Sequence, residues 1–212
     1  MADQLVIIGT GAGNNDMLTA EALTAIGQAE IIIGSKRLME VFARPEQLCY
    51  ELSGDLASLR LNLLAWVGRK VAILVSGDPG FYSILDWLKR EFPNIQYKVI
   101  PGISSMQLAF ARLAQCWYDC KFISLHGRPV QDAVHEIINH HKVCILTDDK
   151  NHPASIIQRV QAAGIKDKWL FIGSALGTSQ EQIWQGKLTE YDATTLNPSY
   201  SVVIIEDECL AL

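Results

Sequence analysis

The stretch VAILVSGDPG (71–80) decides the fold of this chain. Residues 71–76 form a mainly apolar, β-branched run that stops at a Gly-Asp-Pro-Gly turn. A run that is apolar rather than alternating is typical of a strand covered on both faces, as in a parallel α/β sheet. Asp78 directly follows this strand. Its carboxylate could act as a catalytic base, hold a ligand or cap a helix. The other motifs of the chain are needed to distinguish these roles.

Similar short runs recur along the chain and alternate with segments of helical periodicity. The predicted strands are 5–9, 31–34, 71–76, 97–100, 121–125, 143–147, 169–173 and 201–206. The predicted helices lie near 18–29, 35–43, 55–68, 80–91, 103–115, 130–141 and 153–163. The segment QIWQGKL (182–188) is a further candidate strand. This order predicts an α/β fold of two α/β domains in tandem, 1–115 and 116–212.

Composition limits the functions open to the chain. With 212 residues, 49% hydrophobic, it can bury a sizeable core. The net charge of −5 argues against general attraction to nucleic acid or to an anionic membrane. No apolar stretch approaches the roughly 20 residues of a membrane span, and the first residues lack a signal-peptide pattern, so we expect a cytoplasmic protein. The five cysteines include no CxxC pair, which favours reduced thiols and no metal site.

The first predicted strand runs into a glycine-rich turn, GTGAGNND (9–16). A dinucleotide-binding fingerprint needs a third glycine where Asn14 stands, and a P-loop needs a lysine that this turn lacks. The glycines indicate positive φ angles or a close approach of the backbone to another group. A tight turn without a ligand stays open, as does a nucleotide-binding module.

Small or polar loops also follow four later strands, at the end of an α/β sheet where ligands usually bind. They are SGDPG (76–80), PGISS (101–105), SLHGR (124–128) and TDDKNHP (147–153). Their presence in both halves predicts a cleft between the two domains. Ser104 or Ser105 could also cap the helix predicted near 103–115, and Asp78 the helix near 80–91.

Four segments in this order carry a resemblance to a known family. They are VIIGTGAGNNDMLT (6–19), VSGDPGFYS (75–83), PGISSMQLAFARL (101–113) and SLHGR (124–128). Over about residues 4–206 the chain resembles the tetrapyrrole (corrin/porphyrin) methylases, which have the class III methyltransferase fold. The last two segments resemble the members that methylate C5 of cobalt-precorrin-7, and the homologous N-terminal half of the C5,15-methyltransferases.

The resemblance implies an enzyme that uses S-adenosylmethionine and releases S-adenosylhomocysteine. Matched position by position, it implies that the cofactor-binding residues are Gly77, Asp78, Pro79, Phe81, Ser104, Ser105, Leu146, Thr147 and Leu176. Gly11 and Gly13 would lie nearer the tetrapyrrole substrate. Asp78 then becomes a positioning group that orients its turn and meets the cofactor, rather than a base.

A polycarboxylate substrate requires localised cations on an acidic protein. The candidates in or near the loops are Lys36, Arg37, Arg112, Arg128 and Lys150. Each of them taken alone is more often a solvated surface charge. His126 is the candidate catalytic base, because imidazole titrates near neutrality, although binding a carboxylate is an equal alternative.

The resemblance also bears on partners. It implies a homodimer, and since 212 residues leave no room for a second methyltransferase domain, it favours a separate chain for methylation and decarboxylation at C15. A metal-free precorrin or another ring position stays open as the substrate. The aromatic residues that could contact a flat macrocycle, although each more often packs in a core or an interface, are Phe81, Tyr82, Trp117, Tyr118 and Trp184.

Overall fold

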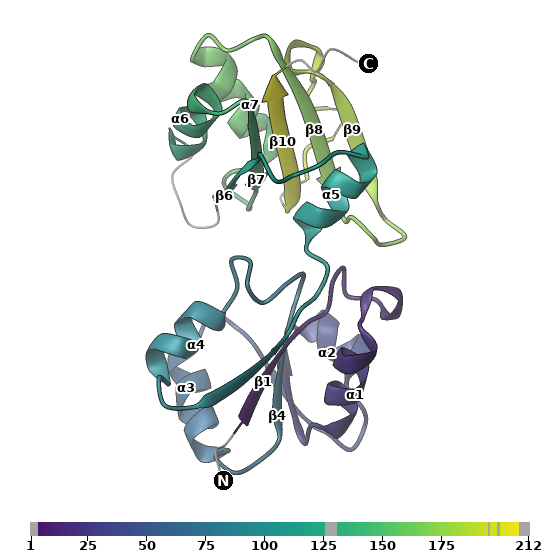
Figure 1. The fold of residues 1–212 in the computed structure, drawn as a ribbon, viewed down its shortest axis with the longest axis vertical. Helices are drawn as coiled ribbons and strands as arrows, with labels where there is room; N and C mark the ends of the chain where they lie inside the picture. Colours follow the sequence, from purple (N-terminus) through teal and green to yellow (C-terminus); the bar gives the residue numbers. More distant parts are fainter. Residues whose placement is uncertain (1–3, 126–130, 195, 199, 208–212) are drawn as a thin grey trace. The chain divides into compact units, whose positions relative to one another are not determined.

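The structure, a computed structural model, describes residues 4–125, 131–194, 196–198 and 200–207. It divides into two compact units, residues 1–104 and 105–212. Each unit holds one five-stranded sheet with its own helices (Figure 1). The α/β class predicted from the strand and helix order is confirmed.

The first unit is built on a parallel sheet with strand order β3-β2-β4-β1-β5. The strands are β1 (Gln4–Gly9), β2 (Ile31–Gly34), β3 (Leu48–Glu51), β4 (Val71–Val75) and β5 (Gln96–Ile100). The helices are η1 (Asn15–Met17), α1 (Ala20–Gln28), α2 (Lys36–Phe42), α3 (Leu56–Ala65) and α4 (Leu85–Glu91). The central strands β2 and β4 are buried at every residue. Burial on both faces explains why their sequences are continuously apolar.

Helices cover both faces of this sheet because successive strand residues point to opposite sides. Ile7 and Ile73 pack in one core with α3 and α4, whereas Ile8 and Leu74 pack in another with α1 and α2 (Figure 1). Two predictions for this unit were wrong. Strand β3 was missed because it is a four-residue edge strand that is largely exposed, and α4 begins at Leu85 rather than near residue 80.

The second unit has a mixed sheet with strand order β6-β7-β10-β8-β9. Its strands are β6 (Lys121–Ser124), β7 (Lys142–Leu146), β8 (Lys168–Ser174), β9 (Gln182–Lys187) and β10 (Ser201–Asp207). Its helices are α5 (Ser105–Leu113), α6 (Gln131–Asn139), α7 (Pro153–Ala162) and η2 (Leu188–Glu190). Strand β10 runs antiparallel to both of its neighbours, and β9 confirms the candidate strand at 182–188.

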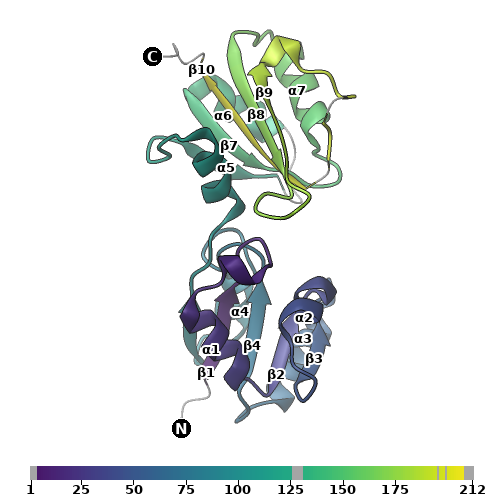
Figure 2. The ribbon, with the colours of Figure 1, turned by 90° about the vertical axis from the view of Figure 1, so that its right-hand side faces the viewer.

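Helices α6 and α7 pack on one face of this sheet through a core that includes Ile137, Ile156 and Val203 (Figures 1 and 2). Helix α5 contacts β10. The structure therefore groups α5 with the second unit, whereas the sequence assigned it to the first. Independent folding with a boundary between residues 115 and 116 stays a prediction, and expression of the fragments 1–115 and 116–212 would test it.

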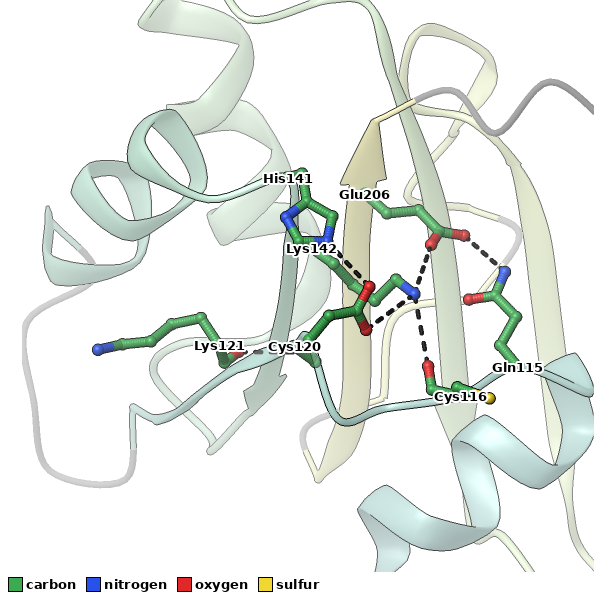
Figure 3. Close-up of polar contacts among 8 residues, drawn as sticks. Gln115, Cys116, Cys120, Lys121, His141, Lys142 and Glu206 are labelled. Carbon is green, nitrogen blue, oxygen red and sulfur yellow. Dashed lines mark hydrogen bonds and ion pairs between the residues drawn. The ribbon is translucent and has the colours of Figure 1, made fainter.

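A polar network fixes the segment after α5 to the sheet (Figure 3). The Lys142 ammonium lies 3.5 Å from an Asp119 carboxylate oxygen, 3.7 Å from Glu206 and 3.4 Å from the Cys116 carbonyl oxygen. The Gln115 amide donates to Glu206 at 2.9 Å. These contacts explain how a charged lysine and the buried carboxylate of Glu206 are accommodated together on one face of the sheet.

Candidate cofactor and substrate site

In the first unit, the ends of three neighbouring strands meet backbone to backbone. Strand β1 lies between β4 and β5, so Gly9, Gly77 and Gly102 come together at the carboxyl edge of the sheet. A β-carbon on Gly9 would lie 2.5 Å from the Gly102 nitrogen and 2.6 Å from the Gly77 oxygen. The close approach that the glycines indicated is therefore between loops of the protein itself.

Asp78 ties two of these loops together. One of its carboxylate oxygens accepts a hydrogen bond from the Gly80 nitrogen at 2.8 Å, and the other accepts one from the Gly102 nitrogen at 3.1 Å. Gly77 adds a backbone pair with Gly11, with N–O distances of 2.8 and 3.3 Å. Because α4 begins at Leu85 without a side-chain cap, Asp78 is not its helix cap. The carboxylate organises the loop cluster instead.

Arg37 lies over the glycine-rich first turn. Its guanidinium donates to the Ala12 carbonyl oxygen at 3.1 Å, and a β-carbon on Gly13 would come within 2.8 Å of its Nη2. Gly11 and Gly13 adopt φ angles of 57° and 83°, which is the left-handed region that glycine tolerates. Lys36 is exposed in the first turn of α2. Arg37 therefore has a positioning role as well as an exposed charge.

The other predicted residues of this unit lie in the same loops. Pro79 is buried, whereas Phe81 is half-buried and packs edge to face on Tyr82. Ser104 is buried and directly precedes α5, and Ser105 is the first residue of that helix. The loops that follow β1, β4 and β5 are thus joined as a single cluster at one edge of the sheet.

In the second unit, Thr147 follows strand β7 and pairs with Ser201 at the start of β10. Its hydroxyl accepts from the Ser201 nitrogen at 2.7 Å and donates to the Ser201 oxygen at 3.1 Å. The carbonyl oxygen of Leu146 accepts from the Leu125 nitrogen at 2.9 Å. Both predicted residues therefore lie at a strand end that is held from two sides, and Ser201 is a partner that sequence reasoning missed.

A second missed pair, Asp148 and Asn151, shapes the same loop. A carboxylate oxygen of Asp148 accepts from the nitrogens of Lys150 and Asn151, at 2.9 and 2.7 Å. The Asn151 amide donates to the Leu125 carbonyl oxygen at 3.0 Å. Both side chains are buried although both are polar. The sequence signal was present, because an Asp in a loop commonly accepts a hydrogen bond from the backbone two residues on, as Asp148 does from Lys150.

Arg112 is engaged within the second unit. Its guanidinium forms two hydrogen bonds with Glu181, at 2.6 and 3.0 Å, and Glu181 also accepts from the Gly177 nitrogen at 2.6 Å. The hydrogen bonds with Arg112 lower the pKa of Glu181, and those with Glu181 raise the pKa of Arg112. Arg112 thus braces the loop that contains the buried Leu176, which accounts for its position without a substrate.

The remaining predicted cations divide between exposed and undescribed positions. Lys150 is exposed next to Asp148. His126 and Arg128 lie outside the described residues. Within the described ranges, no three His, Cys, Asp or Glu side chains converge as in a metal site. None of the helices in the described part of the chain combines the length and apolar character that crossing a membrane requires.

A cluster of strand-end loops at the carboxyl edge of a parallel sheet is typical of α/β proteins that bind small ligands. The family comparison makes the class definite. Residues 4–192 match the family model of the tetrapyrrole (corrin/porphyrin) methylases, and the chain belongs to this family. It is therefore a methyltransferase, and the alternative of a nucleotide-binding module without methyl chemistry loses its support.

Individual relatives agree with this membership. The chain is 30% identical over 207 residues to the cobalt-precorrin-7 C(5)-methyltransferase of Salmonella typhimurium, covering 96% of this chain and 99% of that protein. It is 28% identical over 182 residues to the precorrin-6Y C(5,15)-methyltransferase [decarboxylating] of Sinorhizobium sp, covering 84% of this chain and 44% of that longer protein.

A solved structure shares the fold. It is the uroporphyrin-III C-methyl transferase from Thermus thermophilus complexed with S-adenyl homocysteine, with a TM-score of 0.76 and 16% identity, over 96% of this chain and 97% of that one.

Proposed function

We propose that this protein methylates C5 of cobalt-precorrin-7 to give cobalt-precorrin-8, with S-adenosylmethionine as the methyl donor, in the biosynthesis of cobalamin. One observation carries the proposal. The similarity to the Salmonella enzyme extends over nearly the whole length of both proteins. A match of this extent includes the loop cluster of the first unit and the strand-end loops of the second, so it is not a similarity of one motif alone.

The loop around Asp78 suits the proposed cofactor. A carboxylate can accept about four hydrogen bonds. Asp78 accepts two, from the backbone N–H groups of Gly80 and Gly102. The remaining acceptor positions suit an ammonium or hydroxyl donor of S-adenosylmethionine. We assign cofactor binding to Gly77, Asp78, Pro79, Phe81, Ser104, Ser105, Leu146, Thr147 and Leu176. Thr147 would contribute its carbonyl oxygen or methyl group, since its hydroxyl and its backbone N–H are engaged with Ser201.

The bound cofactor supplies a sulfonium methyl group that an electron-rich ring carbon attacks in line. The protein's contribution to such a transfer is mainly positioning, because no covalent enzyme intermediate is needed. Asp78 orients two loops at once, which fixes the distance between the turn after β4 and the turn after β5. We propose that loops of both units hold the cofactor in a cleft between them.

Cations near the loops would bind the carboxylates of the substrate. Lys36, Arg37 and Lys150 are exposed and suit this role. Gly11 and Gly13 would let the substrate approach the first turn. We retain His126 as the proposed base or carboxylate ligand and Arg128 as a proposed substrate cation. Arg112 suits substrate binding least, because its guanidinium already donates two hydrogen bonds to Glu181.

Cellular context forms a further part of the proposal. We propose a cytoplasmic homodimer that works with a separate chain for the C15 reaction. The Sinorhizobium relative carries both ring positions in its name, and this chain matches 44% of its length.

The same relative favours a second candidate substrate, a metal-free precorrin. The two candidates are separated by incubating the purified protein and S-adenosylmethionine with cobalt-precorrin-7 or with its metal-free counterpart. The proposal predicts that mass spectrometry finds one added methyl group, at a higher kcat/KM for the cobalt form. A preference for the metal-free form would establish the second candidate, and no methylation of either would contradict both.

A further inference from the structure

Tyr82 combines a strained backbone with an exposed aromatic ring. Its φ of 51° lies in the left-handed region, where the β-carbon of any residue other than glycine is crowded. The residue is 48% exposed, although aromatic side chains mostly contribute to a core. Strained residues other than glycine cluster at ligand-binding sites, where the surrounding structure holds them in place.

The usual cause of such a φ angle does not apply at this position. Ala114 shares the left-handed conformation, with φ of 52°. It directly follows α5, where the Gln115 nitrogen donates to the Phe110 oxygen at 3.1 Å, so it is an ordinary helix end. Tyr82 ends no helix, because it follows a turn and α4 begins only at Leu85.

The turn around Tyr82 is held by its own contacts. The Phe81 nitrogen donates to the backbone carbonyl oxygen of Asp78 at 3.2 Å, and the Ser83 hydroxyl donates to the carbonyl oxygen of Pro79. The rings of Phe81 and Tyr82 meet edge to face, with centroids 4.9 Å apart. These contacts keep the ring in place at the carboxyl edge of the sheet.

A second exposed apolar residue belongs to the neighbouring loop. Ile103 is 40% exposed and follows Gly102, whose nitrogen donates to Asp78. Tyr82 and Ile103 thus come from the two loops that Asp78 joins. A tetrapyrrole has an apolar ring face surrounded by carboxylates, and an aromatic ring provides contact area for such a face without charge.

We propose that Tyr82 is a substrate-binding residue that contacts the ring face of the tetrapyrrole, and that Ile103 of the neighbouring loop adds apolar surface. This assignment rests on the proposed function. The local strain keeps the ring exposed, so the side chain contributes to recognition of the macrocycle as well as to the packing of the turn.

Three variants separate the ring from the strain. Tyr82→Phe keeps both, Tyr82→Ala removes the ring but keeps the β-carbon, and Tyr82→Gly removes both. Relief of strain should make the Gly variant melt about 2–4 °C above the Ala variant. The KM for cobalt-precorrin-7 should nevertheless rise roughly tenfold in both, and stay within about twofold in Tyr82→Phe. The affinity for S-adenosylhomocysteine, measured by calorimetry, should not change.

Ala114→Gly is the matched control, because it relieves the same φ angle at a helix end and should leave KM unaltered. A structural role for Tyr82 predicts a different pattern, in which KM recovers in the Gly variant as the melting temperature recovers. That pattern, or an unchanged KM in Tyr82→Ala, would overturn the assignment.

An equilibrium titration with cobalt-precorrin-7, followed by corrin absorbance, keeps this test independent of catalysis. If the unaltered protein binds the compound but transfers no methyl group, the proposed function fails while the tenfold weaker binding of Tyr82→Ala still supports the contact. Equal affinity of the unaltered protein and Tyr82→Ala would refute the contact alone. Absence of binding by the unaltered protein would refute both.

Discussion

Substitution of Gly9 by alanine tests whether the three strand ends are as closely packed as the structure indicates. The new β-carbon would lie 2.5 Å from the Gly102 nitrogen, 2.6 Å from the Gly77 oxygen and 2.8 Å from the Gly102 α-carbon. All three are backbone atoms, so no side chain can rotate away. Ordinary contact begins at 3.4 Å, and the backbone must therefore retreat by about 0.9 Å.

The expected loss of stability has two parts. Overpacking of this kind costs about 1–3 kcal/mol. The displaced Gly102 nitrogen also donates to the Asp78 carboxylate, and weakening a hydrogen bond to a charged group adds about 1 kcal/mol. A total of roughly 2–4 kcal/mol corresponds to a fall in Tm of about 10 °C for a protein of this size. Binding of S-adenosylhomocysteine should weaken as well, because Asp78 loses its fixed orientation.

Scanning calorimetry of Gly9→Ala measures this loss, and Gly54→Ala is the matched control. Gly54 is an exposed loop glycine with no atom within 4 Å of an added β-carbon. Its substitution should move Tm by no more than about 2 °C. If Gly9→Ala melts as close to the unaltered protein as Gly54→Ala does, the backbone contact between the loops is wrong.

Three further predictions concern the site and the second unit. Asp78→Ala should weaken binding of S-adenosylhomocysteine in calorimetry, whereas Arg37→Ala should mainly raise the KM for the tetrapyrrole, and the reverse pattern would show that the two loops are assigned wrongly. Glu181→Gln should lower Tm at pH 7 by about 2–4 °C, since a partly exposed ion pair contributes about 1 kcal/mol. The folded pKa of Glu181 is lowered, so this stabilisation is present above the unfolded value of 4.5 and is lost as the pH falls through the folded pKa. The two melting temperatures should therefore converge below pH 4.5, and a constant difference would refute the role of the charge. Burial raises the pKa of Cys120 to about 12 and that of the fully buried Cys144 well above its usual value. Iodoacetamide at pH 9 followed by peptide mapping should therefore label the exposed Cys49 and Cys116 before these two, and early labelling of Cys120 would contradict its burial.

The sequence predicts the elements that are long and buried, and it fails where local signals compete with tertiary contacts. The apolar runs of β2 and β4 are recognisable because both faces are covered. The edge strand β3 has only four mostly exposed residues, so no apolar pattern marks it. Its position depends on pairing with β2, and the periodicity of the sequence gives no information about which strands pair.

The candidate site shows the same division. The loops at the strand ends are recognisable from their small residues, but the partner of each side chain is not. Asp78 looks like a cap for a helix near residue 80, yet its partner Gly102 lies on another strand end. Arg112 looks like a substrate cation until Glu181, far along the chain, is seen to pair with it. Long-range pairing of this kind depends on the topology of the sheets.

The position of the added methyl group decides whether this protein is a C5-methyltransferase. The purified protein is incubated with cobalt-precorrin-7 and S-adenosylmethionine carrying a ¹³C-labelled methyl group, and the product is examined by NMR. We expect a single labelled methyl group on C5. A label on any other carbon, or no label although S-adenosylhomocysteine binds the protein, would contradict it.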